Sequence, residues 1–139
     1  LGARAVAGGD VAVAAIGDFL PDGAPLVIEA SGNPAAQRQA LDLLAPGGRM
    51  VVVGHSRAPV ELWASRDLIQ QEKTILGSEY FDPDEFVPNQ RLVLEGRLEP
   101  ARLVTHRLPL AGIAEAYRLF WAGETGKVLV YPGGITDAA

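Results

Sequence analysis

The chain has 139 residues, of which 48% are hydrophobic and 21% charged, and its formal net charge is −5. This length and composition predict an ordered globular chain, and the negative charge argues against a nucleic-acid partner, which requires a basic surface. Cysteine is absent, so the chain contains no disulfide, no thiolate zinc site and no cysteine nucleophile.

No apolar run approaches the length of a membrane span, and no signal-peptide pattern is visible. We therefore expect no membrane partner and a cytoplasmic location. The chain begins with Leu1, and its only methionine is Met50. We expect it to be a piece of a longer protein.

The first predicted elements are a short strand at residues 3–6 and a helix at 10–20, where apolar residues recur at helical spacing. A turn at 21–23 then leads into an apolar strand at 25–30. A continuous apolar run of this kind is typical of a strand that is buried on both faces of a parallel sheet.

A helix follows this strand. Asn33 is a good N-cap, and Pro34 suits the first helical position, where its missing N–H is not needed. Residues 46–48 (Pro-Gly-Gly) end the helix, and residues 49–54 form the next buried strand. This strand–helix–strand unit predicts a right-handed crossover between parallel strands.

The rest of the chain continues the alternation of strands and helices. The expected strands lie at 60–63, 73–80, 103–106 and 127–131, and the expected helices at 65–71, 84–95 and 110–121. Ser65 is expected to cap the first of these helices, while Gly96 and Gly123 end the other two. The pattern predicts an α/β fold with an open, mostly parallel sheet.

Three turns follow predicted strands, at residues 30–33, 54–56 and 77–80, and each contains Gly and Ser. Ligands of open α/β sheets bind beyond the carboxyl ends of the strands. Gly and Ser are common in any turn of this kind, so three such turns at one sheet edge are stronger evidence for a ligand site than a single turn is. None of them is a G-x-G-x-x-G or Walker-type loop, so the sequence contains no phosphate-binding loop.

The two histidines, His55 and His106, are not spaced as a metal site. His55 follows a strand and could contact a ligand or be solvated, whereas His106 is better explained as structural. We find no Ser/His/Asp arrangement and assign no catalytic and no metal-binding residue. Lys127 is either solvated or, on the same sheet, a point charge facing an anionic cofactor.

Three segments closely resemble the carboxyl-terminal region of medium-chain dehydrogenases, in order and in spacing. They are LVIEASGNPAAQRQALDLLAPGGRMVVVGHS, KTILGSEYF and LVTHRLPLAGIAEAYRLFWAGETGKVLV. The zinc-dependent alcohol, polyol and threonine dehydrogenase branch is the most similar. The resemblance covers nearly the whole chain. It implies a Rossmann fold that binds NAD or NADP, with hydride transfer between the nicotinamide and an alcohol or ketone substrate.

The resemblance also implies cofactor contacts. Ala30, Ser31 and Gly32 match the turn beside the adenosine side of the cofactor. Val53, Gly54 and His55 match the turn along the nicotinamide, and Ser78, Glu79 and Tyr80 match the turn at its carboxamide. Lys127 matches a basic position that faces the pyrophosphate. In the family's dimers the strand before the carboxamide turn lies near the interface, so Lys73 to Tyr80 is the expected dimer contact of a homo-oligomer.

Two parts of the family's pattern are not in this sequence. The catalytic domain carries the Cys, His and Glu zinc ligands, and the first βαβ unit carries the Gly-rich pyrophosphate loop. We therefore expect residues 1–139 to form a single partial dinucleotide-binding domain, a partial Rossmann fold without catalytic residues. Zinc would belong only to the catalytic domain. NAD or NADP would bind this chain weakly, and the chain alone would be inactive.

Other interpretations remain open. A truncated domain with exposed sheet edges could act as a non-catalytic dimerising module. The piece LAPGGRMVVVG alone is also similar to a strand of S-adenosylmethionine-dependent methyltransferases. The zinc-free quinone reductase branch belongs to the same family and is closely related to the zinc-dependent branch of the main interpretation.

Overall fold

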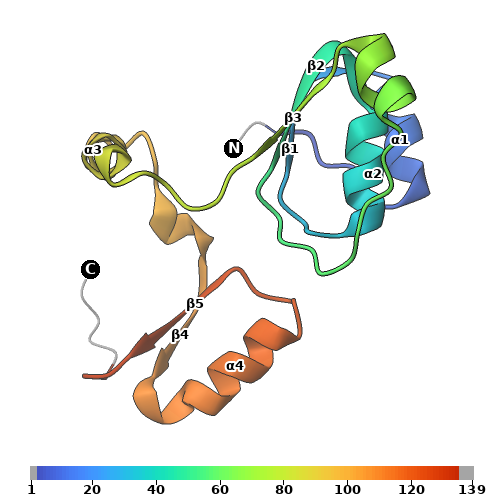
Figure 1. Ribbon diagram of the computed structural model, residues 1–139. Helices are drawn as coiled ribbons and strands as arrows, with labels where there is room; N and C mark the ends of the chain where they lie inside the picture. Colours follow the sequence, from blue (N-terminus) through green and yellow to red (C-terminus); the bar gives the residue numbers. More distant parts are fainter. Residues whose placement is uncertain (1–2, 135–139) are drawn as a thin grey trace. The chain divides into compact units, whose positions relative to one another are not determined.

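The computed structural model describes residues 3–134, and the chain divides after Tyr80 into two compact units (Figure 1). Each unit contains its own parallel sheet. The α/β class and the parallel strand pairing are as the sequence predicts. Among the described residues, no helix has the length and apolar character needed to cross a bilayer.

The first unit is a three-stranded parallel sheet with the order β1-β2-β3. Its elements are α1 (Asp10–Gly17), β1 (Ala24–Glu29), α2 (Pro34–Asp42), β2 (Leu44–Val52) and β3 (Thr74–Gly77). Glu29 pairs with Val52, and Val52 with Gly77, so the three strands end in line. The turns that follow them therefore emerge at one edge of the sheet.

The start of α2 is as predicted. The Asn33 side chain accepts hydrogen bonds from the backbone N–H of Ala35 (2.9 Å) and Ala36 (3.4 Å), and Pro34 occupies the first helical position. The cap fixes where the chain leaves the turn after β1 and enters the helix.

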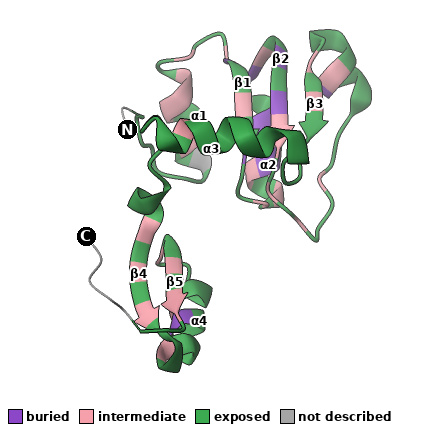
Figure 2. Ribbon diagram, turned by 90° about the vertical axis from the view of Figure 1, so that its left-hand side faces the viewer, coloured by how far each residue is buried: buried purple, intermediate pink, exposed green. Residues whose placement is uncertain are grey.

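The core of this unit lies between α2 and β2 (Figure 2). Leu41 is only 1% exposed and packs with Ala40, Leu44 and Met50. Apolar residues from all three strands and from the segment before β3 pack against this cluster, namely Val27, Val52, Leu68 and Ile75. The core thus holds the strands in register beneath the helix.

Several predicted elements of the first unit are wrong. Residues 3–6 and 60–63 form no strand. Residues 65–71 form a π-helical turn (Ala64–Leu68) and a 3₁₀ turn (Ile69–Gln71), because the segment is tied to α2 by side-chain contacts of Asp67. Trp63, not Ser65, occupies the cap position, and no side chain caps the turn.

β2 also begins earlier than predicted. The backbone N–H of Ala24 donates to the carbonyl of Leu43 (2.8 Å), so pairing with β1 starts as soon as α2 ends. A register irregularity between Ala24 and Leu26 then accommodates residues 46–48. The Pro-Gly-Gly stretch is thus part of the strand and not a separate loop.

The second unit contains α3 (Phe86–Leu94), β4 (Val104–Pro109), α4 (Ile113–Trp121) and β5 (Lys127–Tyr131). β4 and β5 form a two-stranded parallel sheet that is separate from the first. Gly96 (φ 68°) and Gly123 (φ 72°) follow α3 and α4 in the left-handed conformation, as predicted for helix ends.

We expect Leu41→Ala to lower the free energy of unfolding of the first unit by about 2–5 kcal/mol, because it leaves a cavity in the only fully buried large side-chain position described there. Ile69→Ala, at a side chain 69% exposed, should change it by less than about 0.5 kcal/mol. Urea unfolding followed by circular dichroism measures both. Equal effects would contradict the assignment of the core.

Candidate functional site

The turns after β2 and β3 border a cleft of about 560 Å³ at the carboxyl edge of the first sheet. Val53, Gly54 and His55 line it from one side, and Ser78 and Glu79 from the other. The volume lies in the range typical of small-molecule sites, about 300–1,000 Å³. The structure therefore brings together five of the residues that the sequence assigned to the cofactor.

The first predicted turn lies directly behind this cleft. A Cβ atom on Gly32 would lie 2.0 Å from the carbonyl oxygen of His55, and one on Gly54 would lie 2.2 Å from the backbone nitrogen of Gly32. The two turns thus approach each other more closely than any side chain allows. Ala30 and Ser31 line a separate hollow beside β1 and α2.

Glu29, the last residue of β1, organises the first turn. Its side chain is buried, and one carboxylate oxygen accepts hydrogen bonds from the backbone N–H of Ser31 (2.7 Å) and Gly32 (3.2 Å) and from the Ser31 hydroxyl. Burial raises the pKa of Glu29, but the hydrogen bonds from Ser31, Gln37 and Gly32 outweigh it and hold the pKa below its usual range. The carboxylate is therefore ionised at neutral pH.

The sequence analysis did not assign Glu29 to the site. A signal was available, because Glu29 ends an otherwise apolar strand, and a buried charge requires hydrogen-bonding partners close by. The short residues of the next turn, with their free N–H groups, are such partners.

His55 and Glu79 face each other across the mouth of the cleft. The His55 Nε2 lies 3.4 Å from Glu79 Oε1, and both side chains are mostly exposed. This contact is an ion pair only when the imidazole is protonated. It joins the turn after β2 to the turn after β3, and water screens it.

The remaining predicted site residues lie outside the cleft. The Tyr80 side chain is 91% exposed, and its backbone adopts a left-handed φ of 57°. Lys127 begins β5 in the second unit, where it pairs with Val104. The expectation that Lys127 shares a sheet with the three turns is wrong, because β4 and β5 pair only with each other.

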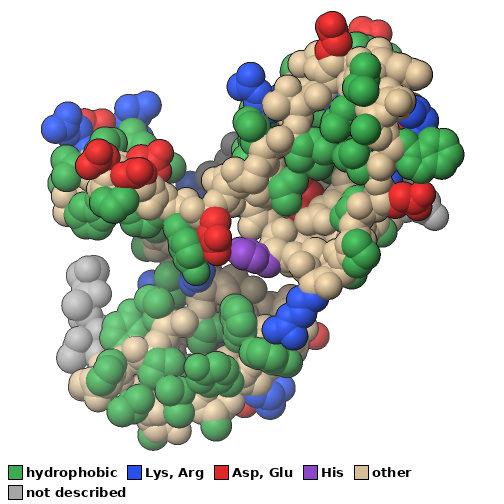
Figure 3. All heavy atoms as spheres, viewed as in Figure 1, with side chains coloured by type: hydrophobic (Ala, Val, Ile, Leu, Met, Phe, Trp, Pro, Cys, Tyr) green, Lys and Arg blue, Asp and Glu red, His purple; other side chains and the backbone are tan. Residues whose placement is uncertain are grey.

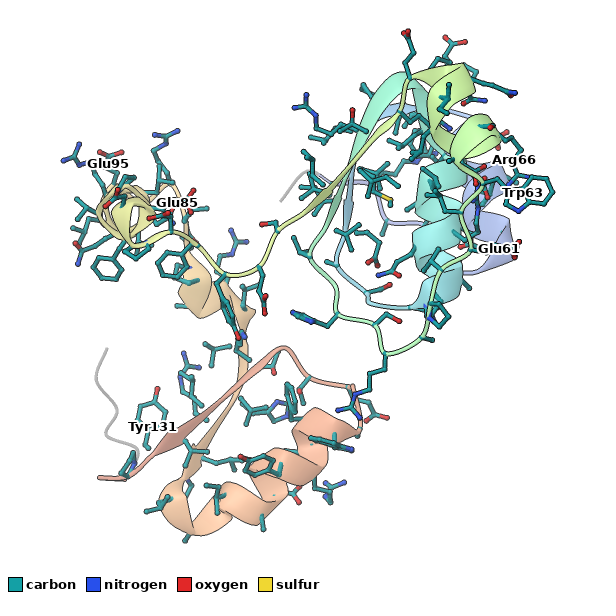
Figure 4. All side chains as sticks on the ribbon, in the orientation of Figure 1. Glu61, Trp63, Arg66, Glu85, Glu95 and Tyr131 are labelled. Carbon is teal, nitrogen blue, oxygen red and sulfur yellow. The ribbon has the colours of Figure 1, made fainter. Side chains whose placement is uncertain are left out.

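A second charged cluster holds the segment between β2 and β3 against α2. The buried Asp67 carboxylate accepts hydrogen bonds from Arg38 (2.6 and 3.1 Å), from Arg66 (2.8 Å) and from the Trp63 N–H (2.9 Å). These donors hold the pKa of Asp67 well below its usual range. The side chains of Glu61, Trp63 and Arg66 lie together at this place (Figure 4). The same segment contributes Ala58 and Val60 to the cleft wall.

Nothing in the sequence pattern indicated this cluster, because Arg38 and Asp67 lie far apart in the chain. Within residues 3–134, no group of three or more His, Asp or Glu side chains could hold a metal ion. A catalytic zinc therefore does not fit the described part of the chain.

The second unit has an apolar groove of about 290 Å³ between α4 and β5. Hydrophobic side chains gather on this face in Figure 3, and those lining the groove include Ile113, Tyr117, Phe120 and Val128. The cleft of the first unit is the better candidate site, because backbone and side-chain polar groups converge on it.

Comparison with known proteins agrees with this architecture. The family model described as zinc-binding dehydrogenase matches residues 1–95. The chain therefore belongs to the zinc-binding dehydrogenase family, which confirms the resemblance to the alcohol and polyol dehydrogenase branch seen in the sequence.

Individual relatives cover the chain more fully. An L-threonine 3-dehydrogenase from Symbiobacterium thermophilum is 37% identical over 114 residues, which make up 79% of this chain and 32% of that relative. A solved alcohol dehydrogenase from Thermus sp. ATN1 is 31% identical, with a TM-score of 0.76 over 85% of this chain and 34% of that one. A solved NAD-dependent alcohol dehydrogenase is 27% identical, with a TM-score of 0.73 and coverage of 85% and 34%. The chain thus spans about a third of the length of the proteins it matches.

We expect Gly54→Ala to destabilise the first unit by about 1–3 kcal/mol, because its Cβ would be forced against the Gly32 backbone. Gly77→Ala is the matched control, since a Cβ there would meet no atom within 4 Å beyond its chain neighbours, and its effect should stay within about 0.5 kcal/mol. Thermal unfolding compares the two. A tolerated Gly54→Ala would show that the two turns are not in contact.

Proposed function

We propose that this chain is the coenzyme-binding portion of a zinc-type NAD(P)-dependent alcohol or polyol dehydrogenase. The observation that carries the proposal is the cleft at the carboxyl ends of β2 and β3, which is where parallel α/β sheets bind nucleotide cofactors. Membership of the zinc-binding dehydrogenase family supports it, as does the likeness to a protein described as an NAD-dependent alcohol dehydrogenase.

We assign each turn to a different part of the bound cofactor. The turn Val53–His55 lies along the nicotinamide, and the turn Ser78–Tyr80 meets its carboxamide. The turn Ala30–Gly32 lies on the adenosine side. The cleft is large enough for a nicotinamide nucleotide half.

Bound NAD or NADP supplies the hydride acceptor or donor. The residues of this chain bind and orient the cofactor but do not act on the substrate. The described residues contain no site for zinc, and the sequence has no Gly-rich pyrophosphate loop. We therefore propose that turnover of an alcohol or ketone belongs to a longer enzyme, and that the chain alone binds the cofactor weakly and is inactive. The cytoplasmic location stays a prediction.

A titration of the ¹⁵N-labelled chain with NADH tests this proposal. We expect the backbone amide signals of Val53, Gly54, His55, Ser78 and Glu79 to shift, with an affinity in the millimolar range. Ser78→Trp fills the cleft and should abolish the shifts, whereas Glu124→Gln, at an exposed residue of the second unit, should leave them unchanged.

S-adenosylmethionine serves as the competing ligand in the same titration. Shifts with S-adenosylmethionine and none with NADH would favour the methyltransferase interpretation over the dehydrogenase. No shifts with either ligand would favour the non-catalytic dimerising module. Each of these results contradicts the proposed function.

We also propose a homodimer that forms through Lys73 to Tyr80. β3 is an edge strand of the three-stranded sheet, and its Leu76 side chain is 43% exposed. An exposed apolar edge strand favours pairing with another chain.

Leu76→Lys should convert the dimer to a monomer in analytical ultracentrifugation, because edge lysines oppose strand pairing. Leu94→Lys places the same charge on an exposed residue of α3 and should leave the dimer intact. A monomeric wild-type chain, or a Leu76→Lys dimer of unchanged strength, would refute this interface.

A further inference from the structure

Glu29 contacts both cofactor turns of the first unit at once. We infer that Glu29 and Gln37 form a positioning pair that fixes the turn Ala30–Gly32 relative to the turn Val53–His55. The meaning of these turns for a cofactor rests on the proposed function. The coupling between them rests on contacts within the unit.

The main chain and the side chain of Glu29 serve different turns. Its backbone carbonyl accepts hydrogen bonds from the N–H groups of Val53 (2.8 Å) and Gly54 (3.1 Å). Its carboxylate accepts from Ser31 and Gly32. A shift of the Glu29 backbone would therefore move both turns together, whereas a change of its side chain acts first on the turn Ala30–Gly32.

Gln37, on α2, closes the connection. Its side-chain nitrogen donates to the second carboxylate oxygen of Glu29 (3.1 Å) and to the carbonyl of Gly54 (3.3 Å). Both partners only accept, so the chemistry requires the NH₂ group at this position. Gln37 is itself buried and also borders the cleft. It therefore joins the carboxylate that holds the first turn to the backbone of the second.

The close approach of Gly32 and Gly54 makes this connection stiff. A Cβ on Gly54 would lie 2.9 Å from the Glu29 carboxylate as well as 2.2 Å from the Gly32 nitrogen. No side chain stands between the two glycines to absorb a movement of either turn. A change at Glu29 or Gln37 should consequently reach His55, which directly follows Gly54 and lines the cleft.

Amide hydrogen exchange on the 139-residue chain tests the inference with three variants. Glu29→Gln keeps the shape but sets one NH₂ group against another. Gln37→Glu sets two carboxylates together. The double variant Glu29→Gln/Gln37→Glu reverses the roles and restores a hydrogen bond between the two side chains. Gln70→Glu, at an exposed position, controls for the added charge.

We expect exchange at Ser31 and Gly32 to accelerate about tenfold or more in each single variant. Glu29→Gln replaces the charged acceptor of these N–H groups by a neutral one, and Gln37→Glu removes the donor to Glu29 and sets a second carboxylate against it, which displaces the Glu29 carboxylate from the turn. The double variant should recover most of this protection at Ser31 and Gly32. The amide shift of Gly54 should stay altered in the double variant, because the new carboxylate at position 37 faces the Gly54 carbonyl. Gln70→Glu should match the wild type.

The NADH affinity of the same variants distinguishes this inference from the proposed function. Failure of the wild type to bind NADH would overturn the proposed function but leave the exchange test valid. If the wild type binds, we expect the single variants to bind about tenfold more weakly, and the double variant to recover part of the loss. The destabilised Leu41→Ala variant, assayed where it is folded, should bind as the wild type does.

Two results would overturn the positioning pair. One is unchanged exchange at Ser31 and Gly32 in both single variants. The other is a double variant that is no better protected than the single ones, because a purely local packing defect gives additive losses without rescue.

Discussion

The buried carboxylate of Glu29 sits at the end of β1, and an unpaired charge in that position would be costly, so the chain around it must supply donors. Ser31 and Gly32 supply them from the following turn, and Gln37 supplies another from α2. The requirement to satisfy one charge thus shapes the turn, orients the helix and fixes the neighbouring strand end. These hydrogen bonds thereby set the position of the turn that lies next to the cleft.

The first unit follows a simple division of work. Apolar contacts between α2 and the sheet hold the strands in register, while charged and polar groups define where the turns go. Asp67 plays the corresponding part in the long segment before β3, where its hydrogen bonds from Arg38 tie that segment to α2 and Arg66 donates from within the segment. Both carboxylates are stabilised in the ionised form because their pKa values lie below the ordinary carboxyl range. Their contribution to stability is therefore complete at neutral pH and is lost only as the pH falls into the acidic range, through those lowered pKa values.

Local signals predicted much of this fold. Asn33-Pro34 marked the start of α2, Gly96 and Gly123 marked helix ends, and the apolar run before Glu29 marked a parallel strand.

The predictions from sequence failed where tertiary contacts override the local pattern. Residues 65–71 were predicted to form a helix capped by Ser65, yet Asp67 ties them to Arg38, 29 positions away. Lys127 was expected on the same sheet as the turns, but it lies on the separate sheet of β4 and β5, because periodicity cannot tell which strands share a sheet. The turn residues that line the cleft were predictable since parallel strands end at one edge, whereas the contact between Gly32 and Gly54 depends on a spacing that no sequence pattern reveals.

The central claim is that the Glu29 carboxylate is held ionised by the turn and by Gln37. A pH titration of the Glu29 side-chain carboxyl carbon by ¹³C NMR tests it most directly. The hydrogen bonds require a pKa below the ordinary value of 4.5 and a rise toward or above that value in Gln37→Leu, where burial remains and a donor is lost. A wild-type pKa at or above 4.5, or one that does not change in Gln37→Leu, would contradict the account.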